Sequence, residues 1–148
     1  MYTIGEMAKR LNIAPSTLRY YDKEGLLPFL DRTKGNVRRF AEADFRSLEL
    51  IECLKATGMP IKDIKQFVDW CFAGDATIES RRQMFYERKQ VVEEEMARMQ
   101  RTLDTITYKC WYYDMACKLG STGAVEALEA SEIPPDIRAI KASMDAAR

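Results

Sequence analysis

The chain has 148 residues, a formal net charge of zero and no histidine. A chain of this length forms one domain, or one small domain with an extended appendage. No apolar run approaches the roughly 20 residues that a membrane span requires, and no signal-peptide pattern opens the sequence, so we expect no membrane association. The absence of histidine removes the commonest general base and metal ligand, which disfavours an enzyme.

Four cysteines, Cys53, Cys71, Cys110 and Cys117, lie far apart and form no Cys-x-x-Cys pair. A disulfide scaffold would carry more cysteines in a shorter chain, so we expect reduced thiols in the cytoplasm. Cys110 and Cys117 are separated by about 10 Å along a predicted helix, which is too far for one metal ion held by one chain. We therefore expect neither a metal site nor a cofactor. A metal site formed by cysteines of two chains in a dimer stays open as an alternative.

Charge is unevenly distributed along the chain. The first 40 residues carry eight basic and four acidic side chains, whereas the remainder carries 15 basic and 19 acidic ones. A basic head on an acidic body is typical of a polyanion-binding domain attached to a solubilising one. The excess is modest, so it supports nucleic-acid binding without establishing it.

Two short helices are predicted at the start of the chain. Thr3 and Glu6 can form a capping box, and apolar residues recur on one face of a helix over residues 4–11. Pro15 can take the first position of a second helix, where its missing N–H costs nothing, and Gly25 stops that helix. Two short helices joined by a few residues form a helix-turn-helix, whose second member can enter a DNA major groove.

A basic hairpin and two further helices are predicted next. The stretch FLDRTKGNVRRF has Gly-Asn turn chemistry between short extended pieces, which predicts a wing at residues 30–40. Helical periodicity predicts helices at about residues 43–57 and 60–72, the first ended by Gly58. Residues 73–77 have the composition of a linker.

A long helix without glycine or proline is predicted over residues 78–119. Along it, mostly apolar residues alternate spacings of four and three, the heptad pattern of a coiled coil. We call these positions the seam: Val92, Met96, Met99, Leu103, Ile106, Cys110, Tyr113 and Cys117. The helix spans on the order of 60 Å, too long for a monomer of this size to cover, so we expect a homodimer. Helical fragments at residues 124–130 and 135–147 are predicted behind it.

The words YTIGEMAKRLNIAPSTLRYYDKEGLL, NVRRFAEADF and LKATGMPIKDI occur in the order and spacing of one known family. Over roughly residues 2–70 the chain resembles the MerR-family transcriptional regulators. It is most similar to their aldehyde- and thiol-stress-responsive subgroup (AdhR/NmlR-type), which lacks metal ligands. The resemblance implies a mainly α fold, with a winged helix-turn-helix DNA-binding domain followed by a long antiparallel coiled-coil dimerisation helix. The domain bounds we expect are 1–72 for the DNA-binding domain with a second wing at 43–72, 73–77 for the linker, 78–119 for the dimerisation helix and 120–148 for the tail.

The function implied by the resemblance is promoter regulation without enzymatic activity. Family members bind, as homodimers, pseudo-palindromic operators with an overlong promoter spacer. On activation they twist the DNA so that RNA polymerase holoenzyme can engage both promoter elements. We expect the same partners for this chain, with double-stranded promoter DNA bound in the cytoplasm.

The resemblance and the chemistry of the side chains together assign the DNA contacts. Residues at the start of a recognition helix face base edges, an arginine can fork onto guanine, and tyrosine hydroxyls can reach phosphate. The candidate DNA-binding residues are Ser16, Thr17, Arg19, Tyr20, Tyr21, Asn36, Arg38, Arg39 and Lys62. For Tyr21 the alternative interpretation is a residue of the apolar core. For Arg39 and Lys62 it is a solvated charge on the surface.

The resemblance to the stress-responsive subgroup assigns effector sensing to Cys53. Because Ile51 and Leu54 flank it, we expect an adduct on the thiol to push the helix against its neighbours and to change the angle between DNA-binding elements. An inert core thiol is the alternative.

Other effectors and classes stay open. Trp111, Tyr112 and Tyr113, near the end of the long helix, can line a site for a small organic ligand or pack against the other subunit. An architectural protein without effector would bind many DNA sequences alike. A thiol enzyme is disfavoured because the chain lacks histidine, a Cys-x-x-Cys pair and a glycine-rich cofactor loop.

Overall fold

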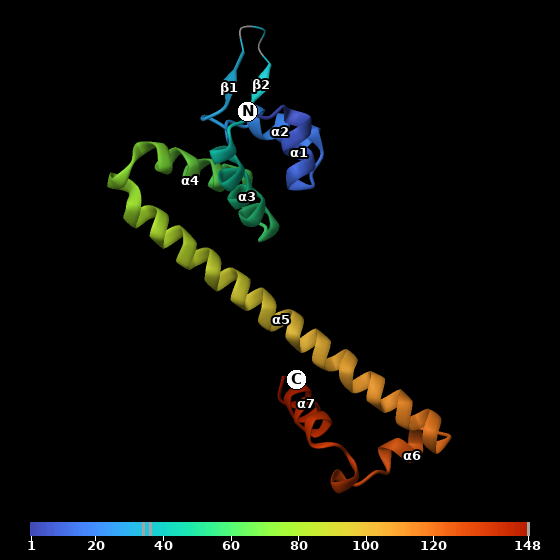
Figure 1. Cartoon of the computed structure of the whole chain (residues 1–148). Coiled ribbons are helices and arrows are strands. Elements are labelled where there is room, and N and C mark those ends of the chain that lie inside the picture. The colour runs from blue at the N-terminus through green and yellow to red at the C-terminus, as the bar shows by residue number, and fades with distance from the viewer. Residues whose placement is uncertain (34, 36, 148) are drawn as a thin grey trace. The chain divides into compact units, whose positions relative to one another are not determined.

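The computed structural model describes residues 1–33, 35 and 37–147. The chain forms two compact units, Met1–Lys89 and Gln90–Arg148, and the boundary falls inside the longest helix (Figure 1). In chain order the elements are α1 (Ile4–Leu11), α2 (Pro15–Lys23), β1 (Asp31–Arg32), β2 (Arg38–Arg39), α3 (Glu42–Ala56), α4 (Ile61–Ala73), the 3-10 turn η1 (Asp75–Thr77), α5 (Ile78–Leu119), α6 (Thr122–Glu126), η2 (Ala130–Glu132) and α7 (Pro135–Ala146). The division of the chain into four domains at residues 72, 77 and 119 stays a prediction.

The helix boundaries follow from local chemistry. At the start of α1 the backbone N–H of Thr3 donates to the Glu6 carboxylate at 2.7 Å, and the Thr3 hydroxyl accepts from the Glu6 N–H, which confirms the capping box. Asn12, with φ 56°, ends α1 in the left-handed conformation. Pro15 occupies the first position of α2, and Gly25, with φ 75°, turns the chain after it.

One apolar core holds the first unit together. α1 packs on α2 and α3, and α3 packs on α4. The largest fully buried side chains are Met7, Leu18, Tyr21, Leu26, Phe40, Leu48, Ile51 and Ile64. Each buried leucine or isoleucine of this kind contributes about 1.5–3 kcal/mol relative to an exposed one. These residues come from α1, α2 and the turn after it, the end of the hairpin, α3 and α4, so the core fixes the helix-turn-helix against the helices that follow it.

The predicted wing is a two-stranded antiparallel hairpin, which projects from the helices of the first unit (Figure 1). Asp31 pairs with Arg39 and Arg32 with Arg38. At its base Tyr2 and Phe40 exchange backbone hydrogen bonds of 2.7 and 2.9 Å. Because the Phe40 side chain is fully buried, it anchors the hairpin to the core.

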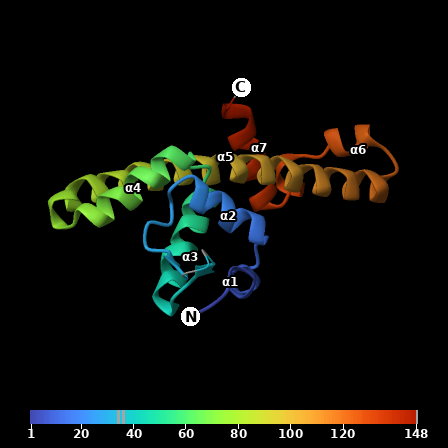
Figure 2. The same cartoon turned by 90° about the horizontal axis from the view of Figure 1, so that it is seen from above.

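In the second unit the chain turns back after Gly120 through α6 to α7 (Figure 2). α6 begins before the start of the fragment predicted at 124–130, because the Ser121 hydroxyl caps the helix by accepting from the Ala124 N–H at 3.2 Å. It also ends before residue 130, with Ala127 as its C-cap. Val125 and Ile137 of the tail are buried. On α5 a row of partly buried side chains accompanies them: Asp104, Tyr108, Trp111, Tyr112, Met115 and Ala116. The tail therefore packs on one face of the C-terminal part of α5, over residues 104–116.

The seam lies on a largely opposite face of α5, as 100° per residue requires. Its central side chains are exposed, by 66% at Met96, 62% at Met99, 53% at Leu103 and 54% at Ile106. α5 thus has one apolar face covered by its own tail and one that is open to solvent in a single chain. Pairing of seams between two chains stays a prediction.

Candidate nucleic-acid interface

The N-terminal end of α2 is open to solvent. Ala14, Pro15 and Ser16 are exposed and Thr17 is half-buried. No side chain caps this end of the helix. Pro15 has no N–H and the Thr17 N–H donates to the Ala14 carbonyl at 2.9 Å, so the Ser16 N–H and the positive end of the helix dipole are what this end offers to an acceptor. Hydroxyl side chains at such a helix end suit base edges and phosphate oxygens.

One turn further along α2, Arg19 and Tyr20 are exposed, Tyr20 by 44%. Within the described residues, Arg19 has neither a hydrogen bond nor an ion pair, so its guanidinium is available to a ligand. A free guanidinium near the start of a recognition helix can reach guanine bidentately. DNA contact by these residues stays a prediction.

Tyr21 is the candidate that the structure corrects. Its side chain is fully buried, and its hydroxyl donates to the carboxylate of Glu52 on α3. Burial, and then the hydrogen bond to Glu52, raise the pKa of Tyr21, which keeps the phenol a neutral donor. The assignment of Tyr21 to a phosphate contact was therefore wrong, and the alternative of a core residue is the one the structure supports. Tyr21 ties α2 to α3.

The wing is tied to α2 by an ion pair. Arg38 places its Nε and Nη2 atoms 2.7 and 2.6 Å from one carboxylate oxygen of Asp22. The Asp22 side chain is only 11% exposed, so water screens the pair little. Arg38 thus fixes β2 of the wing against α2, and its contact with DNA stays a prediction. Arg39 is half-buried, and Asn36 lies outside the described residues.

Lys62 is exposed in the first turn of α4, and its phosphate contact stays a prediction. The lysine that the sequence reasoning missed is Lys65, one turn later. Its stem passes so close to Gly25 that a Cβ there would lie 3.0 Å from Lys65 Cε, and its ammonium pairs with Asp69 at 2.7 Å. Two features therefore favour glycine at position 25: its positive φ, and the close approach of the Lys65 side chain from α4 to the turn after α2.

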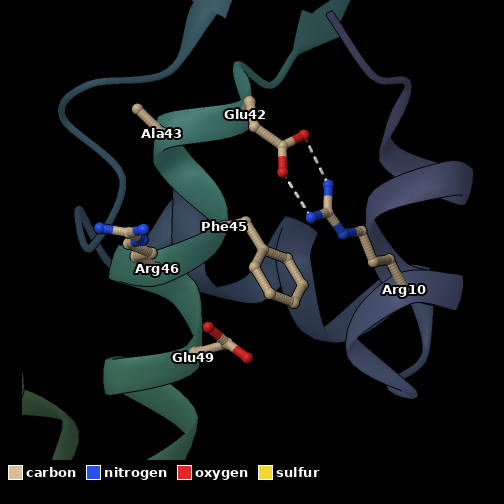
Figure 3. A pocket seen from close by; sticks show the side chains of 6 residues that line it. All are labelled: Arg10, Glu42, Ala43, Phe45, Arg46 and Glu49. Atoms are coloured by element: carbon tan, nitrogen blue, oxygen red, sulfur yellow. Dashed lines mark hydrogen bonds and ion pairs between the residues drawn. The ribbon is translucent and has the colours of Figure 1, made fainter.

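A charged cluster joins α1 to α3 beside a hollow of about 520 Å³ (Figure 3). Arg10 forms a bidentate ion pair with Glu42 and lies over the Phe45 ring, with its guanidinium carbon 4.0 Å from the centroid. Tyr2 donates to the same carboxylate at 2.6 Å. The hydrogen bonds from Arg10 and then from Tyr2 lower the pKa of Glu42 to about 2.

This cluster predicts how stability depends on pH. Because the pKa of Glu42 is lower in the folded chain than in the unfolded one, its contribution is complete above the ordinary carboxyl pKa and disappears as the pH falls through about 2. We expect Glu42→Gln to lower the Tm at pH 7 and the difference from wild type to vanish near pH 2. Added salt should shrink it as well, because the Glu42 side chain is 63% exposed.

Thermal unfolding followed by circular dichroism between pH 2 and 7 measures this effect. Glu49→Gln is the matched control, since Glu49 lines the same hollow but forms neither a hydrogen bond nor an ion pair within the described residues. An equal loss of Tm at pH 7 in both variants would contradict a specific role for Glu42.

Cys53 is exposed on α3, although Ile51 and Leu54 beside it are buried. The alternative of a core thiol is therefore wrong. The expected route, in which an adduct enlarges a packed interior, is wrong as well, because an exposed sulfur extends into solvent. In the described part of the chain all four cysteines are free and exposed. No three of its cysteine, aspartate and glutamate side chains are grouped so that they could hold a metal ion, and none of its helices is long and apolar enough to cross a membrane.

Known proteins share this arrangement. The chain matches the family profile of MerR HTH family regulatory proteins over residues 2–69 and the MerR DNA-binding profile over residues 45–108. A helix-turn-helix transcriptional regulator of Haemophilus influenzae is 44% identical over 124 residues, which cover 84% of this chain and 92% of the relative. The regulator AdhR of Bacillus subtilis is 30% identical over 87 residues, covering 59% of this chain and 62% of AdhR.

Among solved structures, the chain is similar to the crystal structure of HiNmlR, described as a MerR family regulator that lacks the sensor domain and is bound to promoter DNA. The two are 43% identical with a TM-score of 0.73, over 83% of this chain and 98% of HiNmlR. These matches agree with the expectation of a non-enzymatic regulator with a mainly α fold. The chain belongs to the MerR family of helix-turn-helix transcriptional regulators.

Proposed function

We propose that this chain is a homodimeric regulator that binds a pseudo-palindromic promoter operator in the cytoplasm and distorts it for RNA polymerase holoenzyme. The observation that carries the proposal is the open end of α2, with Arg19 unpaired among the described residues, beside a wing that Arg38 and Asp22 hold in place. The similarity to HiNmlR, which is bound to promoter DNA, supports it. In vitro selection from random-sequence DNA tests it, and two inverted half-sites are the expected product. Enrichment of no sequence, or of single half-sites only, would contradict it.

The open seam supports the dimer. Exposed side chains at Met96, Met99, Leu103 and Ile106 form a continuous apolar face on a helix whose other apolar face is already covered. Such a face on a long helix is stabilised by a second helix of the same pattern, and a two-fold axis supplies one. An antiparallel pair would carry one recognition helix at each end.

For the effector we propose an electrophile or oxidant that reacts with Cys53. The thiol is exposed, and the next residue on the same helix, Glu52, binds Tyr21 of the recognition helix. A bulky or charged adduct on Cys53 would therefore lie at the surface beside Glu52 and would weaken the hydrogen bond between Tyr21 and Glu52. This route to a conformational change takes the place of the one expected from the sequence, in which the adduct would enlarge a packed interior.

A reporter driven from the native promoter tests the sensor. We expect Cys53→Ser to lose induction by aldehydes or oxidants, because serine keeps the size of the side chain without its nucleophilicity. The control is a triple serine variant of Cys71, Cys110 and Cys117, which should respond like wild type. Normal induction in Cys53→Ser would exclude Cys53 and direct the search to an organic ligand or a metal near Trp111 and Tyr113. No induction of wild type by any effector would favour an architectural protein.

A further inference from the structure

Two arginines near the start of α5 each bind the C-terminal end of a different helix. Arg88 donates from Nη1 to the carbonyl oxygen of Thr57, the C-cap of α3, at 3.1 Å. Arg81 donates from Nη2 to the carbonyl oxygen of Gly74, the C-cap of α4, also at 3.1 Å. All four residues lie within the first compact unit.

Both contacts follow from the chemistry of helix ends. The last carbonyls of a helix have no partner within the helix and form the negative end of its dipole, so a cation that donates to them is stabilised, as Arg88 is at Thr57. The Gly74 carbonyl also opens η1 and accepts from the backbone N–H and the hydroxyl of Thr77 at 3.1 and 2.8 Å, so Arg81 adds a further donor there. Both arginines are half-buried, and in each the Nε atom is buried without a hydrogen-bond partner among the described residues. A surface arginine would keep Nε in water. These two are instead held by the fold at a cost in solvation.

The pair fixes a direction. Seven residues correspond to two turns of a helix, so Arg81 and Arg88 lie on one face of α5 about 10 Å apart. Two points of attachment, one at the end of α4 and one at the end of α3, hold the first turns of α5 within the first unit. Apolar packing near Arg88 is incomplete, because a hollow of about 250 Å³ opens beside it, lined by Met59 and Met84 among others. The Arg88 contact therefore supplements the apolar packing of α5, in which Phe85 makes an edge contact with Phe67 at 5.2 Å between ring centroids and Met84 packs against the core.

We propose that Arg81 and Arg88 are positioning residues that set the spacing between the two DNA half-sites which the regulator accepts. This inference rests on the proposed homodimer, in which α5 connects each recognition helix to the other. From Arg88 to Leu103 the helix advances about 22 Å, so a tilt of about 10° displaces the middle of the seam by about 4 Å. That displacement is close to the rise of one base pair, about 3.4 Å. Loss of the two contacts would therefore relax the distance between half-sites without changing the base sequence that each recognition helix selects.

The test is in vitro selection with the full-length chain, using random DNA long enough to hold both half-sites. Wild type should enrich inverted half-sites at one fixed spacing, and inserting one base pair into that site should weaken binding about tenfold. The Arg81→Ala/Arg88→Ala variant should enrich the same half-sites over several spacings, with the penalty for the insertion reduced to about twofold. The single variant Arg88→Lys, which keeps the charge and a donor for Thr57, should select the same narrow spacing as wild type.

Arg82→Ala is the matched control, because Arg82 follows Arg81 on α5, is exposed and has its contacts within α5, with Glu79 at 2.8 Å and over the Tyr86 ring. It should select the spacing of wild type. A purely structural role of the arginines would lower the Tm and leave the spacing narrow, and that result in folded variants would overturn the inference. If the double variant does not fold, the two single alanine variants decide by the same measurement. Failure of wild type to enrich paired half-sites would refute the proposed function instead.

Discussion

Leu103→Lys should convert the regulator into a monomer and abolish specific operator binding in the same step. Leu103 lies near the middle of the seam and is 53% exposed in a single chain, so a lysine there is tolerated by the monomer. In a coiled coil the same position is enclosed by the partner helix, where a pair of symmetry-related ammonium groups would be desolvated close to each other. We expect affinity for the operator to fall at least about a thousandfold, toward the level of non-specific binding.

Analytical ultracentrifugation at micromolar concentration and fluorescence anisotropy with the selected operator measure the two effects. Ala97→Lys is the control, since Ala97 is exposed on α5 away from the seam and the substitution adds the same charge. It should stay dimeric and bind the operator. If Leu103→Lys were still a dimer with wild-type affinity, the seam would not be the interface.

Arg19→Ala should have the second-largest effect, on sequence discrimination more than on fold. The guanidinium has no partner among the described residues, so its removal leaves no intramolecular interaction broken. If it reads a base, the specific complex should lose about 1–3 kcal/mol, and the preference should relax at one position in each half-site.

Lys23→Ala is the matched control, because Lys23 is an exposed cation in the last turn of the same helix. We expect it to weaken all DNA sequences alike and by less. Competition binding against operators substituted one base pair at a time separates the two outcomes. A uniform loss over all sequences in Arg19→Ala would place Arg19 on phosphate.

Local chemistry accounts for the parts of the fold that could be predicted. The capping box at Thr3, Pro15 at the start of α2 and the heptad pattern of α5 act over a few residues, and the bounds of α1 and α5 agree with the prediction. The helices α3 and α4 agree within one residue at each end.

Contacts between distant residues decide what could not be predicted. Tyr21 meets Glu52 and Arg38 meets Asp22 over separations of 31 and 16 residues, for which periodicity carries no information. The error at Cys53 has a simpler origin. Although Cys53 is next to the buried Leu54 in sequence, one residue is 100° around a helix, which takes the thiol off the core face.

The tail that packs on the C-terminal part of α5 would also limit how many chains can associate in the homodimer that we propose. A helix with two open apolar faces can receive a neighbour on each, and such contacts continue into bundles or filaments. In this chain Val125 and Ile137 are buried with the row that includes Tyr108 and Trp111, so a second chain finds an apolar face on one side only. In the homodimer that we propose, association would therefore terminate at two copies. Two DNA-binding domains are also the number that an operator with two half-sites can use.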